Sequence, residues 1–163
     1  LAVLGKSMDD FEHYYQLIRR FDMKTSARNQ FLGKVQSVKR GPVNAEIILD
    51  IGGGNALTAI ITADSVDTLG LAEGKEAYAL IKAPWVIVTT DDSLKTSARN
   101  RLCGKVARCV KGAVNSELVI ELPGGKMVVA VVTNESIEEL GLKEGASACA
   151  LIKASHVILA VAA

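Results

Sequence analysis

One set of hydrogen-bond donors occurs twice in the sequence, at a fixed spacing. Its members are Arg and Lys, which are positively charged, and Ser and Thr, which donate through hydroxyls. An all-donor set suits a doubly charged tetrahedral oxyanion, which accepts hydrogen bonds at every oxygen and donates none. The first set is Ser26, Arg28, Thr62, Ser65 and Lys82, and the second, 71 positions later, is Ser97, Arg99, Thr133, Ser136 and Lys153.

Each donor also has a simpler interpretation. Thr62 and Ser65 could form only a helix cap, Arg28 a surface ion pair and Lys82 a solvated strand end. If Thr62 does begin a helix, the first backbone N–H groups of that helix would add to an anion site. Because both copies keep the whole set, we favour a binding site over separate structural roles.

The donors belong to a longer internal repeat. The hexapeptide Lys24–Asn29 returns letter for letter as Lys95–Asn100, and the offset holds without a gap to Lys153. A long unit present twice indicates two copies of one small domain. We therefore divide the chain into residues 1–22, 23–91 and 92–163. Each copy is small enough to be only marginally stable alone, so we expect the copies to pack on each other or on a second chain.

The pattern within each copy predicts mainly β-structure. In the first copy, alternating apolar residues and turn signals predict strands near residues 31–39, 45–51, 56–61, 77–82 and 86–88. A short helix should begin after Thr62 and end at Gly70. We expect two tandem OB-like β-barrels, each with a short helix. Residues 1–22 have helical spacing and predict a connecting α-helix that contains His13.

Composition argues against several classes of protein. The net charge of +1 and the 4% aromatic content give no general basis for binding nucleic acid, and no apolar run is long enough to span a membrane. Catalytic motifs are lacking: the two histidines are not equivalent, and the repeated Glu46/Glu117 has no acid–base partner in the sequence. We therefore predict that the chain is not an enzyme. The three cysteines, Cys103, Cys109 and Cys149, are odd in number and unrepeated, which predicts buried thiols in a reducing cytoplasm.

The residues that carry the repeat resemble a known family. The stretch Thr25–Val35 (TSARNQFLGKV), followed by ITADS at Ile61–Ser65 and LIKA at Leu80–Ala83, resembles the Mop (molbindin) family of molybdate-binding domains. The tandem pair after a short helix is similar to the effector part of ModE-type molybdate-responsive transcription regulators. The resemblance extends from residue 24 to residue 161.

The resemblance implies an oxyanion site without direct protein–metal bonds. It implies molybdate or tungstate held by hydrogen bonds at the subunit interfaces of a homodimer. By motif match, the contacts in the first copy are Ser26, Ala27, Arg28, Thr62, Ser65, Lys82 and Ala83. The second-copy equivalents are Ser97, Arg99, Thr133, Ser136 and Lys153. Within one copy, Arg28 and Thr62 are expected to lie too far apart to contact the same anion, so we expect another protomer to complete the set. Since Gln30 becomes Arg101 and Pro84–Trp85 becomes Ser155–His156 in the second copy, we favour the first.

Three functions are compatible with these observations. The first is the cytoplasmic molybdate-sensing and dimerisation domain of a transcription regulator, whose DNA-binding domain would precede Leu1. The second is a molybdate storage or buffering protein made of the same units. The third and least favoured is an OB-fold nucleic-acid binder, which would require basic grooves and stacking aromatics.

Overall fold

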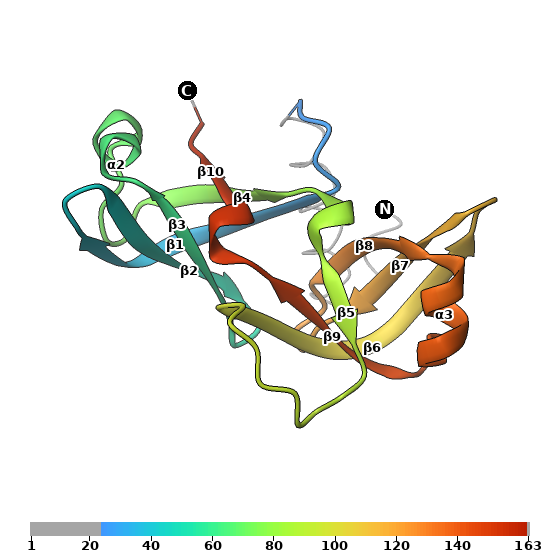
Figure 1. Ribbon diagram of the computed structural model, residues 1–163. Coiled ribbons are helices and arrows are strands. Elements are labelled where there is room, and N and C mark those ends of the chain that lie inside the picture. The colour runs from blue at the N-terminus through green and yellow to red at the C-terminus, as the bar shows by residue number, and fades with distance from the viewer. Residues whose placement is uncertain (1–23, 163) are drawn as a thin grey trace, which may run out of the picture.

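The computed structural model describes residues 24–162, which form two five-stranded antiparallel sheets with short helices between strands. The prediction of two tandem, mainly β units is thus confirmed (Figure 1). The connecting helix predicted for residues 1–22, with His13, lies outside the described residues.

The first copy follows the predicted order of strands and helix. Thr62 accepts a hydrogen bond from the backbone N–H of Ser65, and Gly70 ends the helix in the left-handed conformation (φ 63°), as predicted. The elements are β1 (Asn29–Arg40), β2 (Asn44–Gly52), β3 (Asn55–Thr62), α2 (Ala63–Leu69), β4 (Glu76–Ile81), the 3₁₀-helix η2 (Ala83–Trp85) and β5 (Ile87–Thr89).

The second copy repeats these elements closely. Its ladder even has a register shift between Val106 and Arg108, which matches the shift between Val35 and Ser37 in the first copy. The elements are β6 (Asn100–Lys111), β7 (Asn115–Glu121), β8 (Met127–Thr133), α3 (Asn134–Leu140), β9 (Ser147–Ile152), the 3₁₀-helix η3 (Ala154–His156) and β10 (Ile158–Ala160).

The two copies exchange their last strands. The first sheet has the order β10-β4-β1-β2-β3, and the second has the order β5-β9-β6-β7-β8. Each sheet therefore contains four strands of one copy and the fifth strand of the other (Figure 1). The strand predicted near residues 86–88 exists, but it pairs with β9 and not with its own copy. This exchange carries η2 onto β8 and η3 onto β3.

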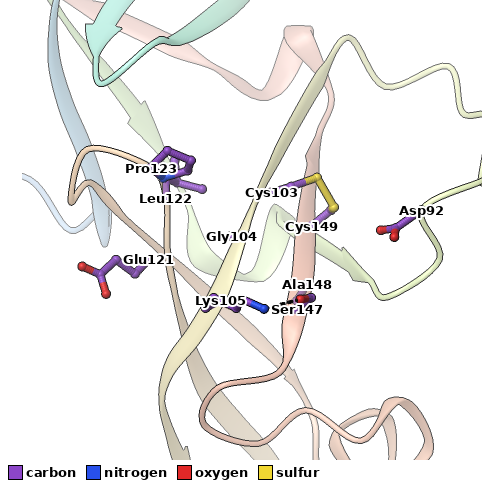
Figure 2. A pocket seen from close by; sticks show the side chains of 10 residues that line it. All are labelled: Asp92, Cys103, Gly104, Lys105, Glu121, Leu122, Pro123, Ser147, Ala148 and Cys149. Carbon is purple, nitrogen blue, oxygen red and sulfur yellow. Dashed lines mark hydrogen bonds between the residues drawn. A yellow bond between two sulfur atoms is a disulfide. The ribbon is translucent and has the colours of Figure 1, made fainter.

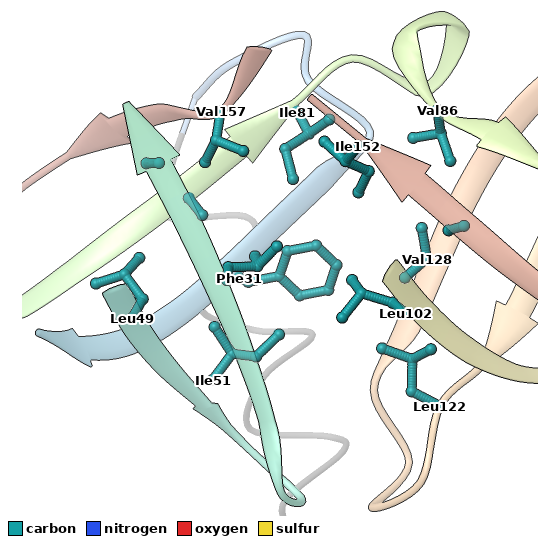
Figure 3. Close-up of a cluster of buried hydrophobic side chains, with 14 of the residues drawn as sticks. Phe31, Leu49, Ile51, Ile81, Val86, Leu102, Leu122, Val128, Ile152 and Val157 are labelled. Carbon is teal, nitrogen blue, oxygen red and sulfur yellow. The ribbon is translucent and has the colours of Figure 1, made fainter. Parts of the chain in front are cut away.

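One hydrophobic core extends through both copies. Phe31 of β1 is 4% exposed and belongs to the same buried cluster as Leu102 and Val128 of the second copy. In Figure 3, Phe31 lies between side chains of the first copy, such as Ile51, and those of the second. The core is almost entirely aliphatic, as the low aromatic content requires. Because this core is shared, apolar surface buried between the copies stabilises both of them, although each would be only marginally stable alone.

The prediction for the cysteines was wrong in two respects. Cys103 of β6 and Cys149 of β9 form a disulfide, and Cys103 is exposed. The two residues face each other directly in the antiparallel ladder, a position that sequence spacing does not reveal. Cys109 is a free, half-buried thiol.

Candidate functional site

The sheet register places the predicted donors of the first copy at two ends of one barrel. Asn29, the first residue of β1, pairs with Ile81, so Arg28 and Lys82 lie side by side at one end. Thr62 pairs with Asn44, next to the far end of β1. A strand of 12 residues covers about 36 Å along its path. The first copy alone therefore does not bring Thr62 and Ser65 to Arg28, and the expectation that another protomer completes the set stays a prediction.

The second copy of the same chain meets the Arg28 end of the first barrel. The guanidinium of Arg28 donates two hydrogen bonds to the carboxylate of Glu117 on β7, Nη1 to Oε2 at 2.6 Å and Nη2 to Oε1 at 2.7 Å. Glu117 pairs with Val131 of β8, two residues before Thr133. The 3₁₀-helix η2, which follows Lys82 and begins with the buried Ala83, packs on the same strand β8. Arg28 and η2 thus lie along the strand that leads to Thr133.

Thr133 and Ser136 form a pair of hydroxyls at the end of β8. Thr133 Oγ1 accepts from the backbone N–H of Ser136 at 3.1 Å, and the two hydroxyl oxygens lie 2.9 Å apart. The first copy has the same arrangement, in which the Thr62 and Ser65 hydroxyl oxygens lie 2.7 Å apart. Both pairs therefore cap short helices, and the helix-cap interpretation of these residues is confirmed.

The reciprocal arrangement occurs at the other barrel. Arg99 donates to Glu46 of β2 through one hydrogen bond of 2.9 Å between Nη1 and Oε2. The 3₁₀-helix η3, which follows Lys153, packs on β3, the strand that ends at Thr62. The chain therefore contains two equivalent junctions between copies. In one, Arg28 and the η2 segment after Lys82 meet β7 and β8. In the other, Arg99 and the η3 segment after Lys153 meet β2 and β3.

The two junctions differ where the sequence repeat differs. Gln30 donates from Nε2 to the Thr25 hydroxyl (2.9 Å) and to the Ala27 carbonyl (3.0 Å), so it holds the segment that contains Ser26. Its counterpart Arg101 instead donates to the carbonyls of two residues in the linker between copies. Gln30 thus fixes the segment of its own junction, whereas Arg101 fixes the linker.

The second sequence difference between the two copies places two different ring systems next to each other. Trp85 and His156 occupy equivalent positions in the two copies, and their ring centroids lie 5.0 Å apart. The ammonium of Lys82 lies 5.4 Å from the centroid of the Trp85 ring, which is within the range of a cation–π interaction. Since Trp85 is the one tryptophan of the chain, its fluorescence should respond to changes around Lys82.

Four residues of the junctions were not among the predicted site residues. Glu117 and Glu46 pair with the two arginines, and their repetition in the sequence was the available signal. Asn29 and Asn100, each 2% exposed, hydrogen-bond the backbone of the other copy. Their place inside the repeated hexapeptide was the signal, but it did not separate a structural role from a ligand role.

Each ion pair favours the charged form of its carboxylate. Hydrogen bonds from Arg28 hold the pKa of Glu117 below its usual value, with further lowering from the nearby charges of Arg28 and Arg108. Arg99 lowers the pKa of Glu46 in the same way. The bond to Glu117 raises the already high pKa of Arg28. At neutral pH each junction therefore contains an ionised carboxylate as well as cations.

Other features of the described chain lie apart from these junctions. An open hollow along β6, β7 and β9 is lined by the Cys103–Cys149 disulfide, Lys105 and Glu121 among others, and contains none of the predicted site residues (Figure 2). Within residues 24–162, His, Cys, Asp and Glu side chains form no group of three or more that could hold a metal ion. No helix in that range has the length and apolar composition of a membrane span.

Comparison with known proteins agrees with the repeat. A family model described as the TOBE domain matches residues 25–88 and again residues 96–159. The chain is 45% identical over 152 residues to the Azotobacter vinelandii "Molybdenum transport protein ModE", covering 93% of this chain and 56% of that protein. It is 46% identical over 162 residues to the Rhodobacter capsulatus "Molybdenum-pterin-binding protein MopA", covering 99% of this chain and 61% of that protein. The chain thus spans little more than half the length of these relatives.

A solved structure shares the whole arrangement. The cytoplasmic molybdate-binding protein ModG, crystallised with molybdate bound, is 51% identical, with a TM-score of 0.83. The match covers 86% of this chain and 100% of ModG. None of the three names describes an enzyme, which agrees with the prediction from the sequence. With the family model matched over both repeats, the chain belongs to the TOBE-domain family and contains two copies of that domain in tandem.

Proposed function

We propose that the chain binds molybdate or tungstate as a tetrahedral dianion at the junctions between its two copies. The observation that carries this proposal is the meeting of Arg28 and η2 from one copy with β7 and β8 from the other. That meeting places the charged end of the first copy along the strand that ends at the Thr133 and Ser136 hydroxyls. ModG, which shares the fold and is 51% identical in sequence, is described with molybdate bound, and this supports the choice of anion.

The proposed first site combines residues of both copies. Arg28 and Lys82 supply positive charge, and Ser26 supplies a hydroxyl, while Ala27 and Ala83 supply backbone N–H groups without bulk. In this proposal Thr133 and Ser136, at the end of β8, take the role that the sequence analysis gave to Thr62 and Ser65. Those two residues would serve the reciprocal site with Ser97, Arg99 and Lys153.

Calorimetric titration with molybdate tests the proposal, with sulfate and phosphate as controls. We expect selective uptake that is lost in Arg28→Ala and kept in Arg99→Ala, because the contact of Gln30 with the Ser26 segment has no counterpart at the second junction. Quenching or enhancement of Trp85 fluorescence should follow the same saturation curve. Absence of heat and of thermal stabilisation with every oxyanion would overturn the proposal.

We further propose that the chain is the sensing and dimerisation part of a molybdate-dependent regulator in the cytoplasm. The match to ModE over 93% of this chain supports this reading, and a homologous region in Escherichia coli belongs to a "DNA-binding transcriptional dual regulator ModE". DNA would then be bound through a domain preceding Leu1, and anion binding would shift the conformation of the dimer. Sedimentation of the chain with and without molybdate checks the dimer.

A storage or buffering protein is the second candidate. The match to ModG, which covers that protein completely, favours this reading. Stoichiometry separates the two candidates: uptake near one anion per chain supports the sensor, and uptake of several anions per chain supports the store.

A further inference from the structure

The proposed anion site already contains an anion that belongs to the protein. The Glu117 carboxylate accepts from both terminal nitrogens of Arg28, at 2.6 and 2.7 Å, which is the geometry of a strong bidentate pair. The two side chains are 50% and 30% exposed, so an incoming anion in solution can reach them. Glu117 comes from β7 of the second copy, whereas Arg28 precedes β1 of the first.

Resting on the proposed function, we infer that Glu117 is an internal competitor that limits the affinity of the first site for its oxyanion. A carboxylate and a tetrahedral oxyanion accept hydrogen bonds from the same guanidinium donors. The bound anion must therefore take donors of Arg28 from Glu117 or share them with it. In either case two negative groups lie close together, and their repulsion opposes binding.

The charge state of the residues supports this competition. Glu117 is ionised at neutral pH, since the ordinary pKa of a glutamate lies well below 7 and Arg28 lowers it further. The junction then has Arg28 and Lys82 as cations, with Arg108 also near Glu117, and Glu117 is a resident anion that offsets part of the positive charge offered to a dianion. Replacing Glu117 by Gln removes the charge, keeps one oxygen that accepts a hydrogen bond from Arg28, and puts an NH2 donor in place of the other oxygen.

The other junction provides a matched comparison within the same chain. Glu46 pairs with Arg99 through a single hydrogen bond of 2.9 Å, with similar side-chain exposures of 27% and 48%. A one-point pair holds its arginine less firmly than a two-point pair. Glu46 should therefore compete less than Glu117, and Glu46→Gln should change the affinity less.

The test is calorimetric titration of the whole chain with molybdate and with perrhenate, a tetrahedral monoanion. We expect Glu117→Gln to bind molybdate about 1.5-fold to fivefold more tightly than the wild type, the range of a partly exposed ion pair. The gain should be smaller for perrhenate, since repulsion by Glu117 scales with the charge of the ligand. Glu121→Gln, an exposed glutamate on the same strand, should bind as the wild type does.

A gain of affinity separates this proposal from structural damage, because a misfolded site does not bind more tightly. If the wild type binds molybdate and Glu117→Gln binds it equally or more weakly, the inference is overturned and Glu117 positions Arg28 instead. Equal gains in Glu117→Gln and Glu121→Gln would overturn it too, since they would reflect net charge alone. If the wild type binds no oxyanion at all, the proposed function fails, and the inference fails with it.

Discussion

The side-chain amide of Asn29 forms two hydrogen bonds with the backbone of Val129, on the other copy of the repeat. Asn29 Nδ2 donates to the Val129 carbonyl at 2.8 Å, and Asn29 Oδ1 accepts from the Val129 N–H at 2.7 Å. Asn100 makes the same two bonds with Thr58, at 2.8 and 2.7 Å. Val129 and Thr58 lie on β8 and β3, the edge strands of the two sheets. Each copy thus uses one side-chain amide to hydrogen-bond backbone groups on an edge strand of the other copy.

Replacing Asn29 by Ala should lower the free energy of unfolding by about 2–4 kcal/mol, because two backbone groups of Val129 lose their partners in a buried place. Urea denaturation followed by circular dichroism measures this loss. Asn100→Ala should lose a similar amount, and Asn44→Ala, at an exposed position, should lose little. A loss in Asn29→Ala as small as that in Asn44→Ala would contradict a stabilising role for the two Asn29 hydrogen bonds.

Lys82 and Thr133 should be coupled in molybdate binding, because the proposed first site uses both. In a double-mutant cycle with alanine at both positions, we expect a coupling energy of about 0.5–3 kcal/mol in the binding free energy. The matched cycle of Lys82 with Thr62 should give no coupling, since Thr62 lies at the other junction. Strong coupling between Lys82 and Thr62 would indicate that a partner subunit completes the site, as the resemblance implies for a homodimer.

The Arg28–Glu117 pair should make stability depend on acid pH. The pKa of Glu117 in the folded protein lies below its ordinary value near 4.5, so the pair stabilises the fold above about pH 4.5. This contribution is lost as the pH falls through the folded pKa. Glu117→Gln should be less stable than the wild type by about 0.2–1 kcal/mol at pH 7, the range for partly exposed pairs. The difference should disappear in strong acid, whereas a difference that persisted there would have another origin.

The Cys103–Cys149 disulfide should stabilise the second barrel when it forms. The bond closes a segment with a sequence separation of 46, for which a contribution of about 2–4 kcal/mol is usual. Mass spectrometry after thiol alkylation should find one reactive thiol per oxidised chain, at Cys109, and three after reduction. Thermal denaturation should show Cys103→Ser less stable than oxidised wild type, with Cys109→Ser as the control. Three reactive thiols without reductant would show that the bond does not form under those conditions.

Local sequence was sufficient to predict the elements of each copy. Thr62 and Gly70 mark the ends of a helix through capping and left-handed backbone, which are properties of single residues. The partners of those elements were not predictable in the same way. The repeat is consistent with each closing strand staying in its own barrel, but Ile87–Thr89 pairs with β9 instead. Nothing in the local pattern distinguishes the two pairings, because both bury the same faces.

The same reason limited the prediction of the site. Arg28 and Lys82 were predicted from residue type, and β-register places them together. Glu117 is 89 positions from Arg28, and only the packing of the two copies brings it there. The amide of Asn29 was retained in both copies with the site residues, yet its observed contacts are with backbone. Repetition marks residues that matter to each copy, and geometry is needed to say how.

The exchange of β5 and β10 has a consequence for how the chain can be divided. A cut in the linker after residue 91, where the repeat suggests a domain boundary, would leave each fragment with a strand that fits the other fragment's sheet. Neither fragment could close its own barrel in the observed way, and each would expose an unpaired sheet edge. The two fragments would then bind each other through the exchanged strands, so a chain cut in this linker should remain a single complex until it is unfolded. The indivisible folding unit is the pair of repeats.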